Sequence, residues 1–199
     1  MKLVGRGARR AVVDLMRALD FAARKHRDQR RKGAGAEPYI NHLTEVACLV
    51  AEATAGKDPL VVLGALLHDT LEDTQTTRRE LTREFGREVA ALVSEVTDDK
   101  RLHKAVRKRL QIETAPHKSD RAKLIKIADK TSNLRSLVES PPVDWDIRRQ
   151  REYFAWAQNV VEGCRGVNDQ LEAQFEAARR AGLRAVARRV RGFRRRNRG

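Results

Sequence analysis

The sequence predicts an all-α, single-domain protein. Apolar residues recur at helical spacing along nearly the whole chain, and no segment has the alternation that is typical of a strand. Glycine and proline fall between the periodic segments. The 199 residues are about one domain's worth and are enough to bury a core. We therefore expect a helical domain over residues 1–183 and a flexible arginine-rich C-terminal tail over residues 184–199.

The first helix is expected over residues 8–26, where apolar residues form one amphipathic face. A basic run, two glycines and a proline interrupt this pattern, which predicts a loop over residues 27–39. A second helix is expected over residues 43–55, ended by Gly56.

The third helix is expected to be central and buried. Asp58 and Pro59 form a typical helix start, an N-cap followed by proline at the first helical position. Residues 60–67 are apolar nearly all round, so no face of this helix suits water. We expect it to continue as far as Asp73.

The second half of the chain is also expected to be helical. Thr77 and Glu80 have the spacing of a capping box, which predicts a short helix that ends near Gly86. Further helices are expected over residues 87–96, 103–114, 119–137, 146–162 and 168–181.

Composition excludes several classes of protein. Hydrophobic residues make up 41% and charged residues 35% of the chain, and no apolar run approaches the roughly 18 residues of a membrane-spanning helix. The N-terminal segment is basic with no apolar stretch behind it, so we expect no signal peptide. Cys48 and Cys164 lack CxxC spacing, which argues against a disulfide framework or a cysteine zinc site. We expect a cytoplasmic protein without membrane contact.

The basic charge is concentrated at one end. The net charge is +15, and eight of these charges are arginines in residues 184–199. Such a tail is suited to weak contact with RNA, DNA or anionic lipid through phosphate groups. The alternative is a solvated extension. Phe193 is the only residue of the tail that could stack on a base, which favours this alternative.

Four ionisable residues end the apolar third helix. At helical spacing His68, Asp69, Glu72 and Asp73 share one side. Carboxylates beside an apolar core need nearby cations or strong hydrogen bonds, and a divalent metal would be such a cation. The alternative is an ordinary polar helix end, in which Asp73 caps the following segment.

Two further residues favour the metal. His42 is expected near the start of the second helix, and Asp129 follows an apolar helical stretch. Taken alone, His42 reads as a capping group and Asp129 as an ion-pair partner of Lys130. With His68 and Asp69 they make a mixed nitrogen and oxygen set, which suits Mn²⁺ and leaves positions for water and substrate.

The order His42, His68-Asp69, Asp129 resembles the HD metal-dependent phosphohydrolases. More narrowly, residues 13–182 resemble the hydrolase domain of the RelA/SpoT homologues, above all the small single-domain metazoan SpoT homologue type. The phrases that carry this resemblance are FAARKH (21–26), RRK (30–32), PYINH (38–42), ALLHDTLEDT (65–74), EVTDDK (95–100), KRLQ (108–111), APH (115–117) and ADK (128–130). The resemblance implies the HD-type helical bundle.

The resemblance also implies an activity, the Mn²⁺-dependent removal of pyrophosphate from the 3′ position of guanosine tetra- or pentaphosphate. It implies that Mn²⁺ is held by His42, His68, Asp69 and Asp129. It implies catalytic roles for Glu72 and Asp73, and contacts with the nucleotide substrate for Arg24, Lys25 and Asn133. The longer relatives carry a synthetase domain after this one, so we expect a hydrolase that degrades the alarmone without making it.

The chain departs from the family pattern after Asp129. Thr131 and Ser132 stand where the family usually has leucine and then an aromatic residue or histidine. Leu43 also follows His42 where proline is usual. The side chains near the expected nucleotide pocket are therefore smaller than usual. We expect this departure to affect which base is preferred more than which reaction is catalysed.

Two alternative functions remain open. The same metal site and basic pocket would suit another phosphorylated nucleotide, such as NADPH with its ribose 2′-phosphate. From a different class, the protein would be a nucleic-acid-binding adaptor acting through residues 184–199. The expected metal site keeps a complete set of polar groups whose burial costs free energy. A site without a function has no physical reason to keep them, which argues against the adaptor.

Overall fold

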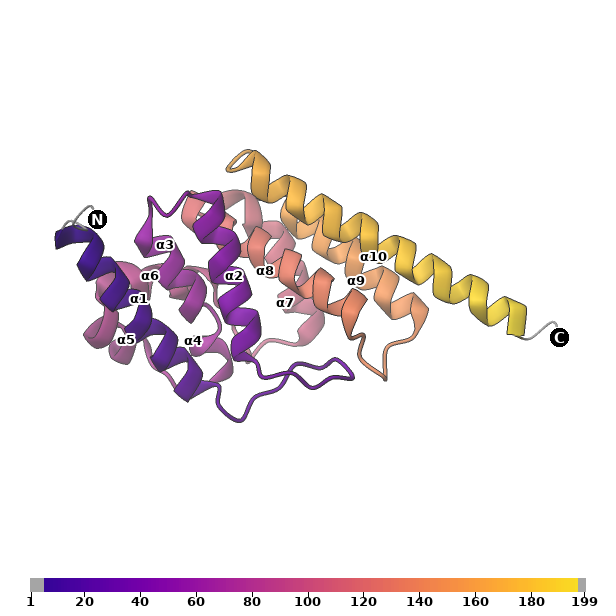
Figure 1. Ribbon diagram of the computed structural model, residues 1–199, viewed down its shortest axis with the longest axis horizontal. Helices are drawn as coiled ribbons and strands as arrows, with labels where there is room; N and C mark the ends of the chain where they lie inside the picture. Colours follow the sequence, from indigo (N-terminus) through magenta and orange to yellow (C-terminus); the bar gives the residue numbers. More distant parts are fainter. Residues whose placement is uncertain (1–5, 197–199) are drawn as a thin grey trace, which may run out of the picture.

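A computed structural model describes residues 6–196, with side chains over residues 10–190 (Figure 1). Within this range the regular structure is helical, and the pairing of Arg30 with Pro38 is an isolated bridge. The all-α prediction is confirmed. The helices are α1 (Arg6–Lys25), α2 (Ile40–Ala53), α3 (Pro59–Leu67), α4 (Thr70–Asp73), α5 (Arg78–Phe85), α6 (Arg87–Val96), α7 (Lys104–Thr114), η1 (Ala115–His117, a 3₁₀ turn), α8 (Asp120–Glu139), α9 (Ile147–Glu162) and α10 (Asp169–Arg196).

The predicted capping residues begin the helices as expected. The Asp58 carboxylate accepts a hydrogen bond from the Val61 amide at the start of α3, with Pro59 at the first helical position. The Thr77 hydroxyl accepts one from the Glu80 amide at the start of α5. Each side chain satisfies an amide that has no partner inside its helix.

Helix α3 is the buried centre of one half of the bundle. It packs against α1, α2, α6 and α8, and residues on all its sides are buried. Gly64 allows the closest of these contacts, because a Cβ there would lie 2.7 Å from Leu92 Cδ2 of α6 and 3.1 Å from Ile125 Cδ1 of α8. This packing fixes the C-terminal end of α3, where His68 follows.

The third helix ends earlier than predicted. Instead of one helix to Asp73, α3 stops at Leu67 and the separate turn α4 begins at Thr70. The Thr70 hydroxyl donates to the Leu67 carbonyl at 2.6 Å and so satisfies a group at the end of α3. The break changes the directions of the side chains on either side of it, so simple helical spacing does not describe them.

Helix α10 runs past its predicted end. It was expected to stop near residue 181, yet it continues to Arg196 and extends along α8 and α9 beyond the rest of the bundle (Figure 1). Gly182 lies inside it because the Phe154 ring packs there, and a Cβ would come within 2.2 Å of the ring. A residue required for packing thus looks like a helix terminator in the sequence.

The described part of the predicted flexible tail is helical. Ala185 and Val186 are buried, and the Arg189 guanidinium donates to Gln150 Oε1 at 2.9 Å and to the Val138 carbonyl at 3.1 Å. Residues 197–199 lie outside the described range. Residues 184–190 therefore belong to the packed bundle.

The described helices and the two cysteines bear on the classes that composition excluded. None of the described helices is long and apolar enough to cross a membrane. Cys48 is exposed, Cys164 is buried, and both are free thiols. The cytoplasmic location stays a prediction.

Candidate active site

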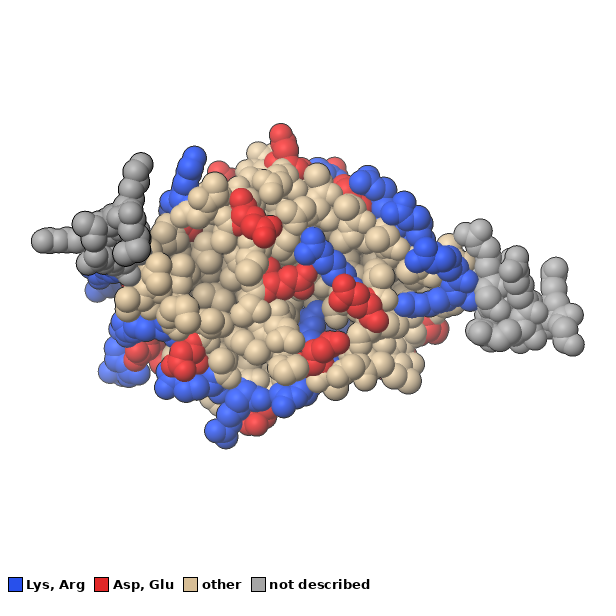
Figure 2. Space-filling model, in the orientation of Figure 1, with Lys and Arg blue, Asp and Glu red and all other residues tan. Residues whose placement is uncertain are grey.

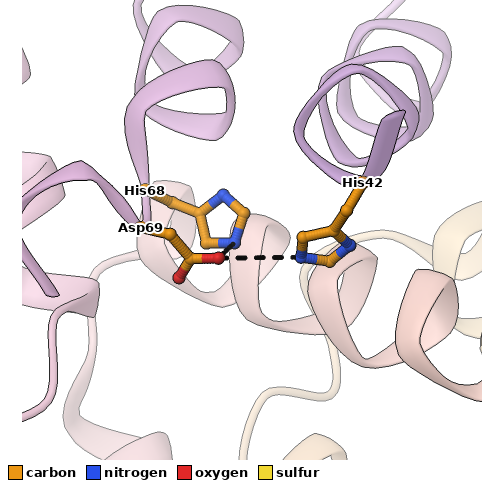
Figure 3. Close-up of side chains that lie close together, drawn as sticks. All are labelled: His42, His68 and Asp69. Carbon is orange, nitrogen blue, oxygen red and sulfur yellow. Dashed lines mark ion pairs between the residues drawn. The ribbon is translucent and has the colours of Figure 1, made fainter. Parts of the chain in front are cut away.

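Three helical segments bring the two predicted histidines and two aspartates together. His42 lies in the first turn of α2, His68 and Asp69 lie between α3 and α4, and Asp129 lies within α8. One donor atom each of His42, His68 and Asp69 lies within 4.8 Å of the others, and Figure 3 shows these side chains facing one another. Asp129 Oδ1 completes the set, 3.3 Å from His42 Nε2 and 4.0 Å from His68 Nε2.

Both histidines point the same ring nitrogen into this cluster. The Nδ1 atom of His68 is 2.8 Å from the Ala65 carbonyl, and a carbonyl only accepts, so Nδ1 carries a proton. The Nδ1 atom of His42 is 2.8 Å from the Ser132 hydroxyl. His68 Nε2 is buried without a hydrogen bond, although Asp69 Oδ2 is 3.1 Å away. A divalent metal between these atoms would satisfy that nitrogen, and the donor set fits one.

Burial and neighbouring charges together shift the pKa of every member of the cluster. Burial lowers the pKa of His42. Burial also lowers that of His68, but Asp69 and Asp129 more than offset it and raise the pKa to about 9. Burial raises the pKa of Asp69, yet His68 and His42 hold it below its usual range. The Asp129 carboxyl behaves likewise, with Lys130 as its main cationic neighbour. Both aspartates are therefore ionised and ready to bind a cation.

Asp129 is held by two neighbours in its own helix. The Lys130 ammonium donates to Oδ2 at 2.8 Å, and the Asn133 amide donates to Oδ1 at 2.5 Å. Asn133 in turn accepts a hydrogen bond from Arg31 at 2.9 Å. The predicted substrate residue Asn133 thus lies beside the cluster and links it to the loop over residues 27–39.

Tyr39 belongs to the site and was not predicted as a site residue. Its hydroxyl donates to Asp69 Oδ2 at 2.6 Å, and its ring stacks on His26 with the centroids 5.2 Å apart. Burial and Asp69 raise the pKa of Tyr39, so the phenol stays a donor. Its position three residues before His42, on the same side of the first turn of α2, was the available signal.

Glu72 and Asp73 lie next to the cluster but have different partners. Glu72 accepts a hydrogen bond from the Asp98 amide at 3.1 Å, and burial, Asp69 and Asp98 raise its pKa to about 7. Asp73 forms an ion pair with Lys100 and accepts a hydrogen bond from Gln29 at 3.0 Å. Glu72 also lies 3.5 Å from the Arg107 guanidinium, but burial and the neighbouring carboxylates prevail and leave it poised to exchange a proton near neutral pH. Asp73 is fixed by Lys100 and Gln29.

A cavity of about 840 Å³ opens onto His68, Asp69, Glu72, Asp73 and Asp129. Many basic side chains line it, from the loop before α2, from the turn between α6 and α7, and from α7, α8 and α9. They are Arg30, Arg31, Lys32, Lys100, Lys104, Arg107, Lys108, Lys126, Lys130, Arg148 and Arg149. Such a cavity suits a small ligand with several phosphate groups.

Arg24 and Lys25 do not line this cavity. Arg24 is exposed and pairs with Asp20 at 2.9 Å, and Lys25 pairs with Glu80 at 2.9 Å. They occupy the last turn of α1, and the chain reaches the cavity only in the loop that follows. The basic residues that this loop brings there are Arg30, Arg31 and Lys32. Residues 24–32 form one basic stretch in the sequence, and composition alone did not show which part of it reaches the cavity.

An aromatic wall of the cavity was also missed. Trp145, Tyr153 and Trp156 line it, and the Tyr153 ring centroid lies 5.3 Å from that of Trp145 and 5.2 Å from that of Trp156. The ammonium groups of Lys108 and Lys130 lie 4.7 Å and 4.6 Å from the Trp156 centroid. The i, i+3 spacing of Tyr153 and Trp156 on one helix was the signal.

The all-α bundle and its histidine–aspartate cluster define a member of the HD domain class, and the HD domain pattern matches residues 18–154. The human guanosine-3′,5′-bis(diphosphate) 3′-pyrophosphohydrolase MESH1 is 54% identical over 160 residues, which cover 80% of this chain and 89% of the human protein. The protein of the same name from Drosophila melanogaster is 47% identical, covering 84% and 94%. The chain belongs to the MESH1 family.

A solved structure supports the same assignment. It is described as a metazoan orthologue of SpoT that hydrolyses ppGpp and has a role in starvation responses. The two folds superpose with a TM-score of 0.81 at 46% identity, covering 84% of this chain and 94% of the other. The similarity therefore extends over nearly the full length of that relative.

Proposed function

We propose that this protein hydrolyses guanosine 3′,5′-bis(diphosphate), ppGpp, and its pentaphosphate analogue to GDP or GTP and pyrophosphate. The observation that carries the proposal is the cluster of His42, His68, Asp69 and Asp129 at a cavity lined with basic side chains. Membership of the MESH1 family supports it, because the human and Drosophila proteins are named for this reaction.

The four clustered residues are the proposed ligands of a divalent metal, for which we propose Mn²⁺. Two imidazole nitrogens and two carboxylates suit Mn²⁺, Fe²⁺ or Zn²⁺, and the carboxylates favour the harder ions. When bound, the metal supplies Lewis-acid activation of water and neutralises charge on a phosphoryl oxygen. The protein's part is to present both Nε2 atoms and both ionised carboxylates from three separate segments.

Glu72 and Asp73 are the proposed catalytic carboxylates. A pKa of about 7 for Glu72, raised by burial, Asp69 and Asp98, suits a group that accepts a proton from water at neutral pH. The Asp98 amide fixes the orientation of this carboxylate. Asp73 holds the Lys100 ammonium at the cavity wall, where a cation would stabilise negative charge on the phosphoryl group.

Recognition of the nucleotide is proposed for basic and aromatic side chains of the cavity. The resemblance implied nucleotide contacts for Arg24 and Lys25, and we propose Arg31 and Lys32 instead because they line the cavity. Asn133 stays a proposed substrate contact beside Arg31. Charged groups around the cavity would hold two diphosphates, and the rings of Tyr153 and Trp156 offer a stacking surface for a base.

Product analysis tests this proposal. Metal-free protein is loaded with Mn²⁺ and incubated with ppGpp, with NADPH in a parallel reaction and EDTA in controls. The expected result is equimolar GDP and pyrophosphate, which EDTA abolishes. Release of phosphate from NADPH without GDP release from ppGpp would assign the site to the alternative substrate. No turnover of either would overturn the proposed activity.

We also propose weak contact of nucleic acid with the arginine-rich segment. Arg180, Arg184 and Arg188 are exposed and follow at intervals of four on α10, and Figure 2 shows basic side chains along this helix. Deleting residues 184–199 would also remove the buried Ala185 and Val186. A gel shift at several salt concentrations should therefore compare the natural protein with an R184Q/R188Q/R191Q/R194Q/R195Q/R196Q/R198Q variant, which keeps Arg189 with its bonds to Gln150 and Val138. Unchanged binding in the variant would refute this contact.

A further inference from the structure

The proposed metal ligand His42 is backed by a chain of polar groups that runs from the buried Ser132 to the partly exposed Glu45 and Arg135. Its Nδ1 atom lies 2.8 Å from the Ser132 hydroxyl oxygen, which lies 2.6 Å from Glu45 Oε2. The other oxygen of Glu45 accepts a hydrogen bond from Arg135 at 3.0 Å. His42 is 3% and Ser132 is 1% exposed, so the contact between these two side chains is shielded from bulk water.

The chemistry of these groups sets the direction of each hydrogen bond. Glu45 is paired with Arg135, and an ionised carboxylate only accepts, so the Ser132 hydroxyl proton points to Glu45. The hydroxyl oxygen then has lone pairs left for His42, and Nδ1 of His42 must donate. In a neutral ring, Nε2 is consequently the bare nitrogen, and this atom faces Asp69 and Asp129.

We propose that Ser132 and Glu45 form a positioning relay that holds His42 in the Nδ1–H tautomer and thereby sets the metal affinity of the site. The relay rests on the proposed metal-binding role of His42. Neither residue touches the metal or the substrate in this scheme. Each acts through His42, as outer partners of metal-bound histidines do in other proteins.

The relay depends on a departure of this chain from its family pattern. Ser132 stands where the resemblance leads one to expect an aromatic residue or histidine. A second cavity of about 230 Å³ adjoins this position and is lined by His42, Glu45, Ser132 and six neighbouring residues. The small serine side chain leaves room for its hydroxyl to lie between His42 and Glu45.

The other histidine and a neighbouring residue provide internal controls. The Nδ1 atom of His68 is fixed by a backbone carbonyl, which no side-chain substitution at Ser132 removes. Thr131 is as buried as Ser132 and lies in the same helix, but its hydroxyl donates to the Ile127 carbonyl at 2.8 Å. A general effect of deleting a buried hydroxyl from α8 would therefore also appear in Thr131→Val.

The test compares Ser132→Ala, Ser132→Thr, Glu45→Gln and Thr131→Val with the natural protein. Long-range ¹H–¹⁵N spectra of the imidazole rings, recorded without metal at a pH where His42 is neutral, report the tautomer. Titration with Mn²⁺ reports the affinity. We expect the Nδ1–H form of His42 in the natural protein, and mixed tautomers in Ser132→Ala and Glu45→Gln. An amide at residue 45 can donate as well as accept.

The Mn²⁺ affinity should fall roughly 10- to 100-fold in Ser132→Ala and Glu45→Gln, which is the usual size of such outer-partner effects. Ser132→Thr should keep the affinity, Thr131→Val should leave it unchanged, and the His68 signals should stay constant throughout. An Nε2–H form of His42 in the natural protein would overturn the relay. Unchanged tautomer and affinity in both Ser132→Ala and Glu45→Gln would do the same.

Failure of the relay and failure of the metal site give different results. If the natural protein bound no Mn²⁺, the proposed metal site would fall, and with it the functional claim for the relay. If Mn²⁺ bound tightly whatever the His42 tautomer, the metal site would stand and the relay alone would be refuted.

Discussion

The Tyr39 hydroxyl donates a 2.6 Å hydrogen bond to Oδ2 of Asp69, the oxygen that also lies 3.8 Å from His42 Nε2 and 3.1 Å from His68 Nε2. The tyrosine precedes α2, and the aspartate follows α3. This contact therefore fixes the carboxylate in the direction of the proposed metal from outside its own segment.

Tyr39→Phe should weaken metal binding while leaving the fold intact. The substitution keeps the ring that stacks on His26 and removes only the donor to Asp69. We expect the Mn²⁺ affinity to fall roughly tenfold or more, measured by calorimetric titration, with an unchanged urea midpoint. Natural affinity in Tyr39→Phe would show that the orientation of Asp69 does not depend on this bond.

Glu72→Gln should lower turnover by about 10² or more while metal stays bound, as expected for loss of a general base. A base works in its deprotonated form, so activity of the natural protein should rise as pH increases through the pKa of Glu72. That pKa is about 7, raised by burial, Asp69 and Asp98, and a bound cation would lower it. Rates from pH 5 to 9 should show this rise. A matching rise in Glu72→Gln would assign the base to another group.

Metal binding should release protons near neutral pH. In the metal-free protein Asp69 and Asp129 overcome the effect of burial and raise the pKa of His68 to about 9, so a metal must displace its proton. The apparent Mn²⁺ affinity should therefore increase as pH rises from 6 toward 9. Calorimetry in two buffers of different ionisation enthalpy measures the protons released. No release at pH 7 would mean that His68 is already neutral there.

Gly182→Ala should destabilise the protein, because a Cβ would come within 2.2 Å of the Phe154 ring. We expect a loss of about 1–3 kcal/mol in the free energy of unfolding, typical of overpacking, measured in urea. A second substitution, Phe154→Leu, should cost less in the Gly182→Ala background than alone. Simple additivity of the two effects would contradict the proposed clash.

Local sequence signals were sufficient for most of the helices, whereas the centre of the site was predicted from the family resemblance. Caps such as Asp58 and Thr77 and the apolar periodicity depend on neighbours in the chain, so they could be predicted from it. The meeting of His42, His68-Asp69 and Asp129 was implied by the resemblance, since no spacing rule joins residues on three separate segments.

What the sequence did not reveal depends on contacts between distant segments. Gly182 continues a helix because Phe154 packs against it, and Arg31 rather than Arg24 reaches the cavity because the chain turns only after Lys25. Tyr39 gains its role from Asp69, which is thirty residues away. In each case the sequence gives the residue type, but the contact partner is known only from the folded structure.

The central claim is that one metal, held by the two histidines and two aspartates, drives hydrolysis of ppGpp. The most direct test is to titrate Mn²⁺ into metal-free natural protein and Asp129→Ala, following bound metal and GDP release in the same samples. The natural protein should bind one Mn²⁺ in the site, with GDP release rising in proportion to its occupancy. Asp129→Ala should lose both together. Full turnover in Asp129→Ala, or GDP release from the natural protein before any metal is bound, would contradict the account.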